Sequence, residues 1–361
     1  MRFIFVLFFI TIACAKEKEV SPPPPEKEKV KKISNLRLLI TIKGKTTAKP
    51  YGDGSGKISV NATATNAQKY TFSFSTGDVI ENTTGRTDYT FKHSGKKDYT
   101  VSVIATSSTG HSQIMRKKIT IHKGYQLIWA DEFNTDGKPD TTRWTYDIGT
   151  GSNGWGNNEA QYYTDRTTNV TVKDGLLKIT AKKESLKGKY YTSARIKTQG
   201  KFSFTYGKVE VKAKLPKGVG TWPAIWMLGN SITSVGWPAC GEIDIMEHVG
   251  KEQNIIHSSL HTTSSFGATT NTHKKKVNAV SETFHIYSVA WDKDKIVFYI
   301  DNKEHYRYEP ANKNKANYPF NAPQFLILNI AMGGTFGGAI TADFKSSSME
   351  VDYIRVYQYK K

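Results

Sequence analysis

Short runs of alternating polar and apolar residues recur along the chain from Leu36 to its C-terminus. Clear examples are residues 57–62, 99–105, 178–181, 208–213 and 295–300. Successive side chains of a β-strand point to opposite faces of a sheet, so this alternation predicts half-buried strands. Gly and Asn separate the runs, and scarcely any segment has the period of an amphipathic helix. The pattern predicts an all-β protein.

The first 13 residues have a different pattern and predict an export signal. Arg2 precedes an apolar run from Phe3 to Ile10, which is too short to span a bilayer as a helix. The following Thr11-Ile12-Ala13-Cys14 resembles a bacterial lipobox, in which the cysteine becomes the lipidated N-terminus. We therefore expect an extracytoplasmic protein, anchored at Cys14 as an outer-membrane or cell-surface lipoprotein. An ordinary secretory signal, giving a secreted protein, is the alternative.

Residues 14–34 predict a linker. Lys and Glu alternate around four consecutive prolines at positions 22–25, a composition that cannot bury a core. This segment is expected to be an extended tether.

Residues 35–122 predict a small β-sandwich. Several short strands in fewer than 90 residues suit an antiparallel two-sheet module. The segments 51–56, 70–74 and 97–101 resemble those of a PKD-type Ig-like module. No cluster of catalytic residue types occurs in it, so a spacer is favoured over a carbohydrate-binding accessory.

Residues 125–361 continue the strand pattern and predict one large β-sandwich domain. If its two sheets are curved, their concave face offers a place for an extended polymer.

Composition and charge argue against several classes of site. The 361 residues carry a formal charge of +19, but residues 1–124 hold 21 Lys and Arg against 9 Asp and Glu. Residues 125–361 hold 30 against 23, which argues against a nucleic-acid site in the larger domain. The two cysteines, Cys14 and Cys240, exclude a disulfide scaffold and a four-thiolate zinc site.

The segment Glu242-Ile243-Asp244-Ile245-Met246-Glu247 carries the candidate chemistry. On a regular strand Glu242 and Asp244 share a face, whereas Glu247 points to the other one. A β-bulge at Ile245–Met246 adds one residue and returns Glu247 to the acidic face. We therefore predict three carboxylates in a row on one side of one strand.

The spacing of these acids favours a retaining glycosidase. The Cα atoms of Glu242 and Glu247 are expected roughly 13 Å apart, and side chains that lean together bring the carboxyls to about 5–6 Å. Retaining enzymes need about 5–5.5 Å, whereas inverting enzymes need about 6.5–9.5 Å. Three like charges in one place also predict that at least one carboxyl keeps its proton near neutral pH.

This segment resembles the active-site signature of glycoside hydrolase family 16, in the bulged branch that includes laminarinases, agarases and carrageenases. The resemblance extends over residues 125–361 and includes residues 129–133, 220–229 and 351–357. It implies a concanavalin-like β-jelly roll with a cleft on its concave sheet. By the resemblance Glu242 is the nucleophile, Glu247 the general acid and base, and Asp244 a hydrogen-bonding partner of the nucleophile.

Further residues are candidates for substrate binding. The loop 154–164 resembles the laminarinase cleft segment, where Asn158 and Glu159 could read sugar hydroxyls. Trp222 and Trp226 share a strand face and could form a sugar-stacking floor, with core packing as the alternative. Arg195 and His261 match positions that contact substrate or line the cleft in the family, with a salt bridge and a structural histidine as their alternatives.

No cofactor is expected for catalysis. The sequence contains no recognisable calcium loop and no zinc-spaced histidine pair. The family resemblance nevertheless implies a structural Ca²⁺, held at the positions of Glu132, Gly175 and Asp352.

The expected function is retaining endo-hydrolysis of β-1,3-glucan by a monomeric laminarinase-like enzyme. The alternatives within the family are hydrolysis of agarose, porphyran, carrageenan or mixed-linkage glucan. A non-catalytic glycan-binding lipoprotein is the alternative from another class, and the intact acid cluster argues against it.

Overall fold

The computed structural model describes residues 29–93 and 95–360. The predicted signal and residues 14–28 of the predicted linker lie outside these residues. The described residues divide into two compact units, of which the smaller contains residues 29–41, 58–89 and 98–119. The larger contains residues 42–57, 90–93, 95–97 and 120–360. No helix in the described part of the chain is long and apolar enough to cross a membrane.

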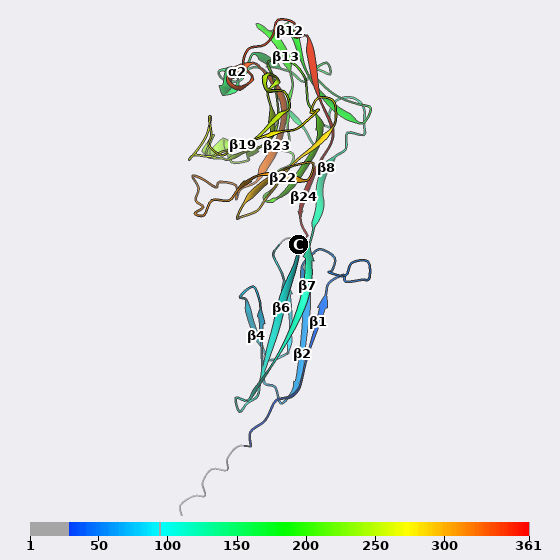
Figure 1. Ribbon diagram of the computed structural model, residues 1–361, viewed down its shortest axis with the longest axis vertical. Coiled ribbons are helices and arrows are strands. Elements are labelled where there is room, and N and C mark those ends of the chain that lie inside the picture. The colour runs from blue at the N-terminus through cyan, green and yellow to red at the C-terminus, as the bar shows by residue number, and fades with distance from the viewer. Residues whose placement is uncertain (1–28, 94, 361) are drawn as a thin grey trace, which may run out of the picture. The chain divides into compact units, whose positions relative to one another are not determined.

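The N-terminal strands form two sheets, and their buried positions alternate as the sequence predicts. The three-stranded sheet has the order β1 (Ser34–Ile42), β2 (Lys57–Thr65) and β5 (Arg86–Thr90). The four-stranded sheet has the order β4 (Val79–Asn82), β3 (Lys69–Phe74), β6 (Gly95–Thr106) and β7 (Ser112–Lys123) (Figure 1). A PKD-type module stays a prediction.

The larger unit contains a ten-stranded sheet. Its main path is β10 (Gln161–Tyr163), β13 (Lys189–Ser193), β12 (Leu176–Leu186), β24 (Ser346–Tyr359), β15 (Gly207–Lys214), β20 (His285–Trp291), β21 (Ile296–Ile300) and β22 (Lys303–Tyr308). Two further strands pair alongside this path, β11 (Val170–Lys173) with β12 and β8 (Tyr125–Asp131) with β24.

The second sheet of this unit has seven strands. Their order is β19 (Thr272–Lys276), β18 (Ile255–His261), β17 (Glu242–His248), β16 (Thr221–Gly229), β23 (Gln324–Met332), β14 (Arg195–Lys197) and β9 (Thr145–Asp147). Helical segments are single turns, namely η1 (Gly154–Asn158), α1 (Ile232–Val235), η2 (Gly250–Glu252) and α2 (Gly334–Gly337). The prediction of an all-β fold is confirmed.

One hydrophobic core joins the two sheets of the larger unit. It contains Val209 and Val211 from the ten-stranded sheet, and Ile225, Ile243 and Leu328 from the seven-stranded sheet, all with no exposed surface. The alternate residues of β16 and β17 therefore point away from this core. That outer face of the seven-stranded sheet carries the candidate site.

Candidate active site

The predicted bulge is present in β17. Asp244 pairs with Trp226 of β16 and Met246 pairs with Ile225, so Ile245 has no partner on that strand. The pairing of β17 with β18 shifts at the same place. One extra residue is accommodated there, and the side-chain alternation changes phase after it.

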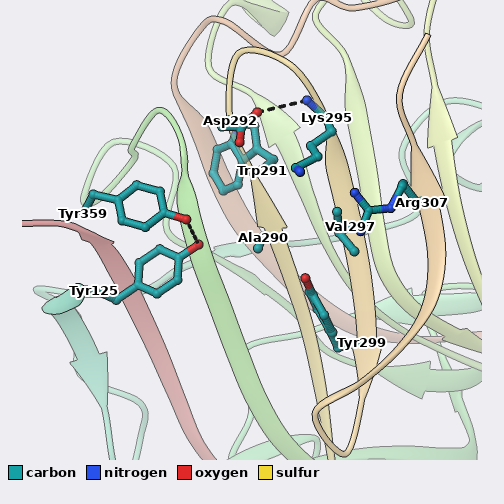
Figure 2. A pocket seen from close by; sticks show the side chains of 9 residues that line it. All are labelled: Tyr125, Ala290, Trp291, Asp292, Lys295, Val297, Tyr299, Arg307 and Tyr359. Carbon is teal, nitrogen blue, oxygen red and sulfur yellow. Dashed lines mark hydrogen bonds between the residues drawn. The ribbon is translucent and has the colours of Figure 1, made fainter. Parts of the chain in front are cut away.

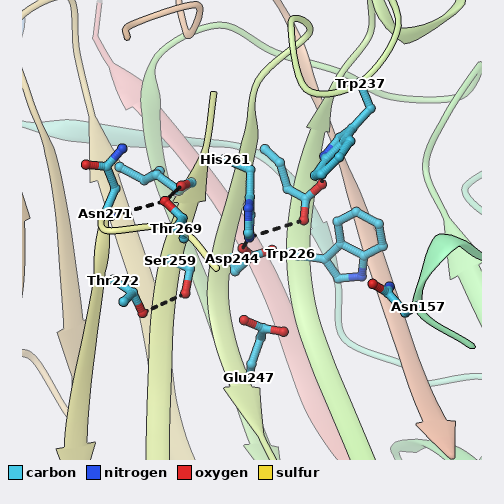
Figure 3. A network of polar contacts seen from close by, with 12 residues as sticks. Asn157, Trp226, Trp237, Asp244, Glu247, Ser259, His261, Thr269, Asn271 and Thr272 are labelled. Atoms are coloured by element: carbon cyan, nitrogen blue, oxygen red, sulfur yellow. Dashed lines mark hydrogen bonds and ion pairs between the residues drawn. The ribbon is translucent and has the colours of Figure 1, made fainter. Parts of the chain in front are cut away.

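Because of this phase change, Glu242, Asp244 and Glu247 lie on the outer face of the sheet, while Ile243 and Ile245 belong to the core. Asp244 is 3% exposed and Glu247 is 9% exposed, so these carboxyls are largely removed from water. Figure 3 shows Asp244 and Glu247 along the same strand. The predicted row of three acids on one side of one strand is what the structure shows.

Glu242 is held by an indole and lies beside an imidazole. The Nε1–H of Trp237 donates a 2.7 Å hydrogen bond to Oε2 of Glu242. His261, the register partner of Glu242 on β18, places its Nε2 3.9 Å from Oε1 of Glu242 and 3.2 Å from Oδ2 of Asp244. His261, which the sequence predicts as a site residue, is therefore adjacent to Glu242 and Asp244 (Figure 3).

Glu247 has its own indole partner. The Nε1–H of Trp222 donates a 2.9 Å hydrogen bond to Oε1 of Glu247. The Trp222 ring packs edge-to-face against Phe336 of α2, with ring centroids 5.4 Å apart. Trp222 was predicted only as a stacking surface; the structure adds a direct contact with a catalytic candidate.

Burial controls the protonation of the cluster. It raises the pKa of Glu242 to about 8, with the charge of Asp244 adding to the rise. It raises the pKa of Glu247 to about 7, although the hydrogen bond from Trp222 opposes this. Burial also holds the pKa of Asp244 well above its usual range. Near neutral pH the cluster therefore retains protons, in line with the expectation from the sequence.

A hydrogen bond joins the carboxyls of Glu242 and Asp244. Two carboxyls can make such a bond only while one of them is protonated. Asp244 is the more buried of the two, and Nε2 of His261 lies 3.2 Å from its Oδ2. The bond raises the pKa of Glu242 and lowers that of Asp244, so the shared proton lies on Glu242 while the site is at rest.

Trp226 and Arg195 extend this face across β16 and β14. The Nε1–H of Trp226 donates a 2.8 Å hydrogen bond to Oδ1 of Asn329 on β23. The Arg195 guanidinium carbon lies 4.7 Å from the ring centroids of both Trp226 and Trp155. Its Nε is 3.0 Å from Oδ2 of Asp147. Arg195 thus makes a salt bridge, which the sequence analysis gave as the alternative to substrate contact. This salt bridge orients the Arg195 side chain between the two aromatic rings.

The loop around η1 differs from the expectation for Glu159. That side chain is 6% exposed, and its Oε2 accepts hydrogen bonds from Gln161 at 2.6 Å and Tyr163 at 3.2 Å. It therefore organises the loop and is not placed to contact a sugar. Asn158 is exposed, and its neighbour Asn157 lies near Trp226 (Figure 3).

The sequence reasoning missed Trp237, Trp155, Asp147 and Asn329. Trp237 stands five residues before Glu242, and an aromatic residue so close to a candidate nucleophile was a usable signal. The other three come from loops and strands distant in sequence, and only the sheet order brings them to this face.

The predicted calcium ligands lie on neighbouring segments, because β24 pairs with both β8 and β12. The Asp352 carboxylate and the main-chain carbonyls of Glu132 and Gly175 are oxygen donors that suit Ca²⁺. However, Oδ2 of Asp352 lies 2.6 Å from Nζ of Lys212, and the Glu132 carboxylate is bound by Arg355 at 2.7 and 2.8 Å. A bound Ca²⁺ must displace Lys212, so the calcium site stays a prediction.

A small pocket on the ten-stranded sheet is separate from the acid cluster (Figure 2). Tyr125 and Tyr359 stack at one side of it with ring centroids 4.3 Å apart, and Arg307 lies at another. Its volume is about 130 Å³, and no pair of carboxyls lines it. This pocket therefore lacks the geometry of a glycosidase site.

Two protein-family models match this chain. The family described as glycosyl hydrolases family 16 matches residues 157–355. A second family, beta-glucan synthesis-associated protein SKN1/KRE6/Sbg1, matches residues 64–243.

Individual relatives match about two thirds of the chain. The chain is 42% identical over 248 residues to a beta-glucanase of Rhodothermus marinus, covering 65% of this chain and 86% of that protein. It is 38% identical over 241 residues to a keratan-sulfate endo-1,4-beta-galactosidase of Sphingobacterium multivorum, covering 65% of this chain and 55% of that one. The crystal structure of a laminarinase from Flavobacterium sp. UMI-01 superposes with a TM-score of 0.61 at 47% identity, covering 64% of this chain and 100% of that one. Because the family match covers more than half of the chain, the chain belongs to glycosyl hydrolase family 16.

Proposed function

We propose that this enzyme hydrolyses internal β-1,3 linkages of laminarin-like glucans with retention of anomeric configuration. The observation that carries the proposal is the row of Glu242, Asp244 and Glu247 on the outer face of β17, created by the bulge at Ile245. The laminarinase and beta-glucanase relatives support β-1,3-glucan as the substrate class.

In the first step the Glu242 carboxylate attacks the anomeric carbon and forms a glycosyl ester. Glu247 gives its proton to the departing glycosidic oxygen, so the bond to the leaving sugar breaks without releasing an alkoxide. The pKa of about 7 suits Glu247 to this role, because it is protonated at and below neutral pH.

In the second step Glu247, now an anion, takes a proton from water, and the oxygen of that water attacks the anomeric carbon, where the bond to Glu242 breaks. Glu242 leaves as a carboxylate, which the Trp237 N–H stabilises. Asp244 takes the shared proton when Glu242 acts as the carboxylate, and it then donates the hydrogen bond to Glu242. Both displacements invert the carbon, so the product retains the configuration of the substrate.

Reducing-sugar release from laminarin, agarose and lichenan tests the substrate class. We expect release from laminarin by the wild-type protein and none by Glu242→Ala. No release from any of the three glycans, with the protein folded, would favour the non-catalytic binding alternative.

Keratan sulfate is the second candidate substrate. The 38% identity to a keratan-sulfate endo-1,4-beta-galactosidase favours its inclusion. An assay of keratan sulfate beside laminarin discriminates the two candidate substrates. Cleavage of keratan sulfate alone would reject laminarin as the substrate.

We also propose that the enzyme acts outside the cytoplasm, as a monomer anchored by a lipid at Cys14, with residues 14–34 as tether and residues 35–122 as spacer. Replacement of Cys14 by Ala is expected to move the protein from the membrane fraction to the medium. A structural Ca²⁺ at Asp352 is expected to raise Tm, and Asp352→Asn is expected to abolish the difference between calcium and EGTA.

A further inference from the structure

Two exposed aromatic rings meet beside the nucleophile. Trp237, in the turn before β17, is 47% exposed, and Phe266, in the loop after β18, is 51% exposed. Their rings pack edge-to-face with centroids 5.4 Å apart and an interplanar angle of 82°. The Trp237 ring is also 6.0 Å from that of His261. Single exposed apolar side chains are ordinary, but a pair tied to a catalytic carboxyl is a specific arrangement.

The orientation of Trp237 is fixed by the site itself. Its indole N–H is used in the 2.7 Å hydrogen bond to Glu242. One edge of the ring therefore points to the carboxylate that attacks the sugar, while about half of the side chain stays open to solvent. The exposed part of this ring is therefore available to a sugar that binds at Glu242.

The loop that carries Phe266 is built to hold it in place. Main-chain hydrogen bonds of 2.9 and 3.0 Å join Thr262 and Ser265 in both directions. The hydroxyls of Ser265 and Thr269 are 2.9 Å apart, and Thr269 donates a 2.9 Å bond to the Leu260 carbonyl at the end of β18. Figure 3 shows Thr269 beside the strands of the site. The loop is preorganised, so presenting Phe266 for binding costs little ordering entropy.

We propose that Phe266 and Trp237 form an aromatic clamp that binds the C–H face of a glucosyl ring next to Glu242. All ring substituents of a β-glucosyl residue are equatorial, so its two faces expose C–H groups. Aromatic faces are apolar surfaces with a negative quadrupole, and they bind such polarised C–H groups. Phe266 is thereby a substrate-binding residue of the enzyme and takes no part in proton transfer. The inference rests on the proposed function, because it names the sugar that this function requires.

The test is the kinetics of Phe266→Ala on laminari-oligosaccharides, with Phe266→Leu and Phe266→Tyr as graded variants. We expect KM to rise by about five- to tenfold for Ala, the effect of losing one aromatic contact, with kcat changed by less than about twofold. Leu keeps apolar bulk without a ring and is expected to resemble Ala, whereas Tyr is expected to resemble wild type.

Tyr190→Ala is the matched control. Tyr190 is 73% exposed and lies on β13 of the ten-stranded sheet, so KM is expected to stay at the wild-type value. An unchanged KM for Phe266→Ala, or a wild-type KM for Phe266→Leu, would overturn the clamp. The proposed function would still stand in that case, because the wild-type protein hydrolyses these sugars. Failure of the wild type to cleave these sugars would instead reject the proposed function.

Discussion

Oε1 of Glu247 accepts a 2.9 Å hydrogen bond from the indole N–H of Trp222 across the β16–β17 pair. Asp244 and Glu242 on the same strand and His261 and His257 on β18 are the titratable groups nearest to this carboxyl. The bond favours the ionised form of Glu247 and so opposes the effect of burial on its pKa. This tryptophan therefore limits how far burial raises the pKa of the acid.

Replacing Trp222 by Phe removes this donor and raises the pKa of Glu247 further above about 7. Because the first step needs a protonated Glu247, the alkaline limb of the kcat/KM profile is expected to move upward by about one pH unit. Trp226→Phe is the control, since its N–H binds Asn329. An alkaline limb that stays in place in Trp222→Phe, or moves equally in both variants, would contradict the assignment.

Replacing Asp244 by Asn is expected to stabilise the protein more at pH 8 than at pH 4. The folded-state pKa of Asp244 is well above its unfolded value of about 3.9, so its contribution to stability is fully present below that value and is lost as pH rises toward the folded pKa. Asn never ionises and avoids this loss. The Tm difference between variant and wild type is expected to grow by at least about 2 °C over this range. The exposed Asp343→Asn should show no such trend; a flat difference for Asp244→Asn as well would refute the argument.

Inserting one alanine between Met246 and Glu247 tests the side-chain alternation that the bulge sets. The added residue moves Glu247 one position along the strand and so turns it toward the core. We expect hydrolysis to fall by at least about 10³-fold and Tm to decrease. Ile245→Val keeps the bulge and is expected to cost only about 1 kcal/mol of stability, with activity retained. Substantial activity in the insertion variant would show that this alternation does not place the acid.

Replacing Glu247 by Ala separates its role from that of Glu242. Loss of the general acid is expected to slow laminarin hydrolysis by about 10²- to 10⁴-fold. An aryl β-glucan oligosaccharide with a good leaving group needs no protonation, so rapid release of one equivalent of the phenol is expected to remain. Glu282→Ala, an exposed carboxylate paired with Lys217, is the control. Equal losses on both substrates would argue against the acid role.

The strand pattern and the bulge could be predicted from the sequence because both depend on the alternation of polar and apolar residues along one strand. Two isoleucines alternate with Glu242 and Asp244, and only one extra residue brings Glu247 to the same face. The contacts that tune the acids could not be predicted in this way. The partner of Glu247 lies 25 residues earlier on β16, and the network around Arg195 combines β9, β14, β16 and η1.

Glu159 shows a second limit of sequence reasoning. A Gly/Asn-rich loop predicted an exposed polar side chain, but the acid is turned inward by Gln161 and Tyr163 on the strand that follows. Whether a loop carboxylate faces solvent depends on partners that loop composition does not specify.

The anomeric configuration of the first product tests the central claim most directly. Proton NMR of laminarin hydrolysis, recorded before mutarotation equilibrates the sugars, should show the β-anomer first, because Glu242 and Glu247 act in two successive displacements. Initial appearance of the α-anomer would mean that water attacks directly and that Glu242 is not the nucleophile.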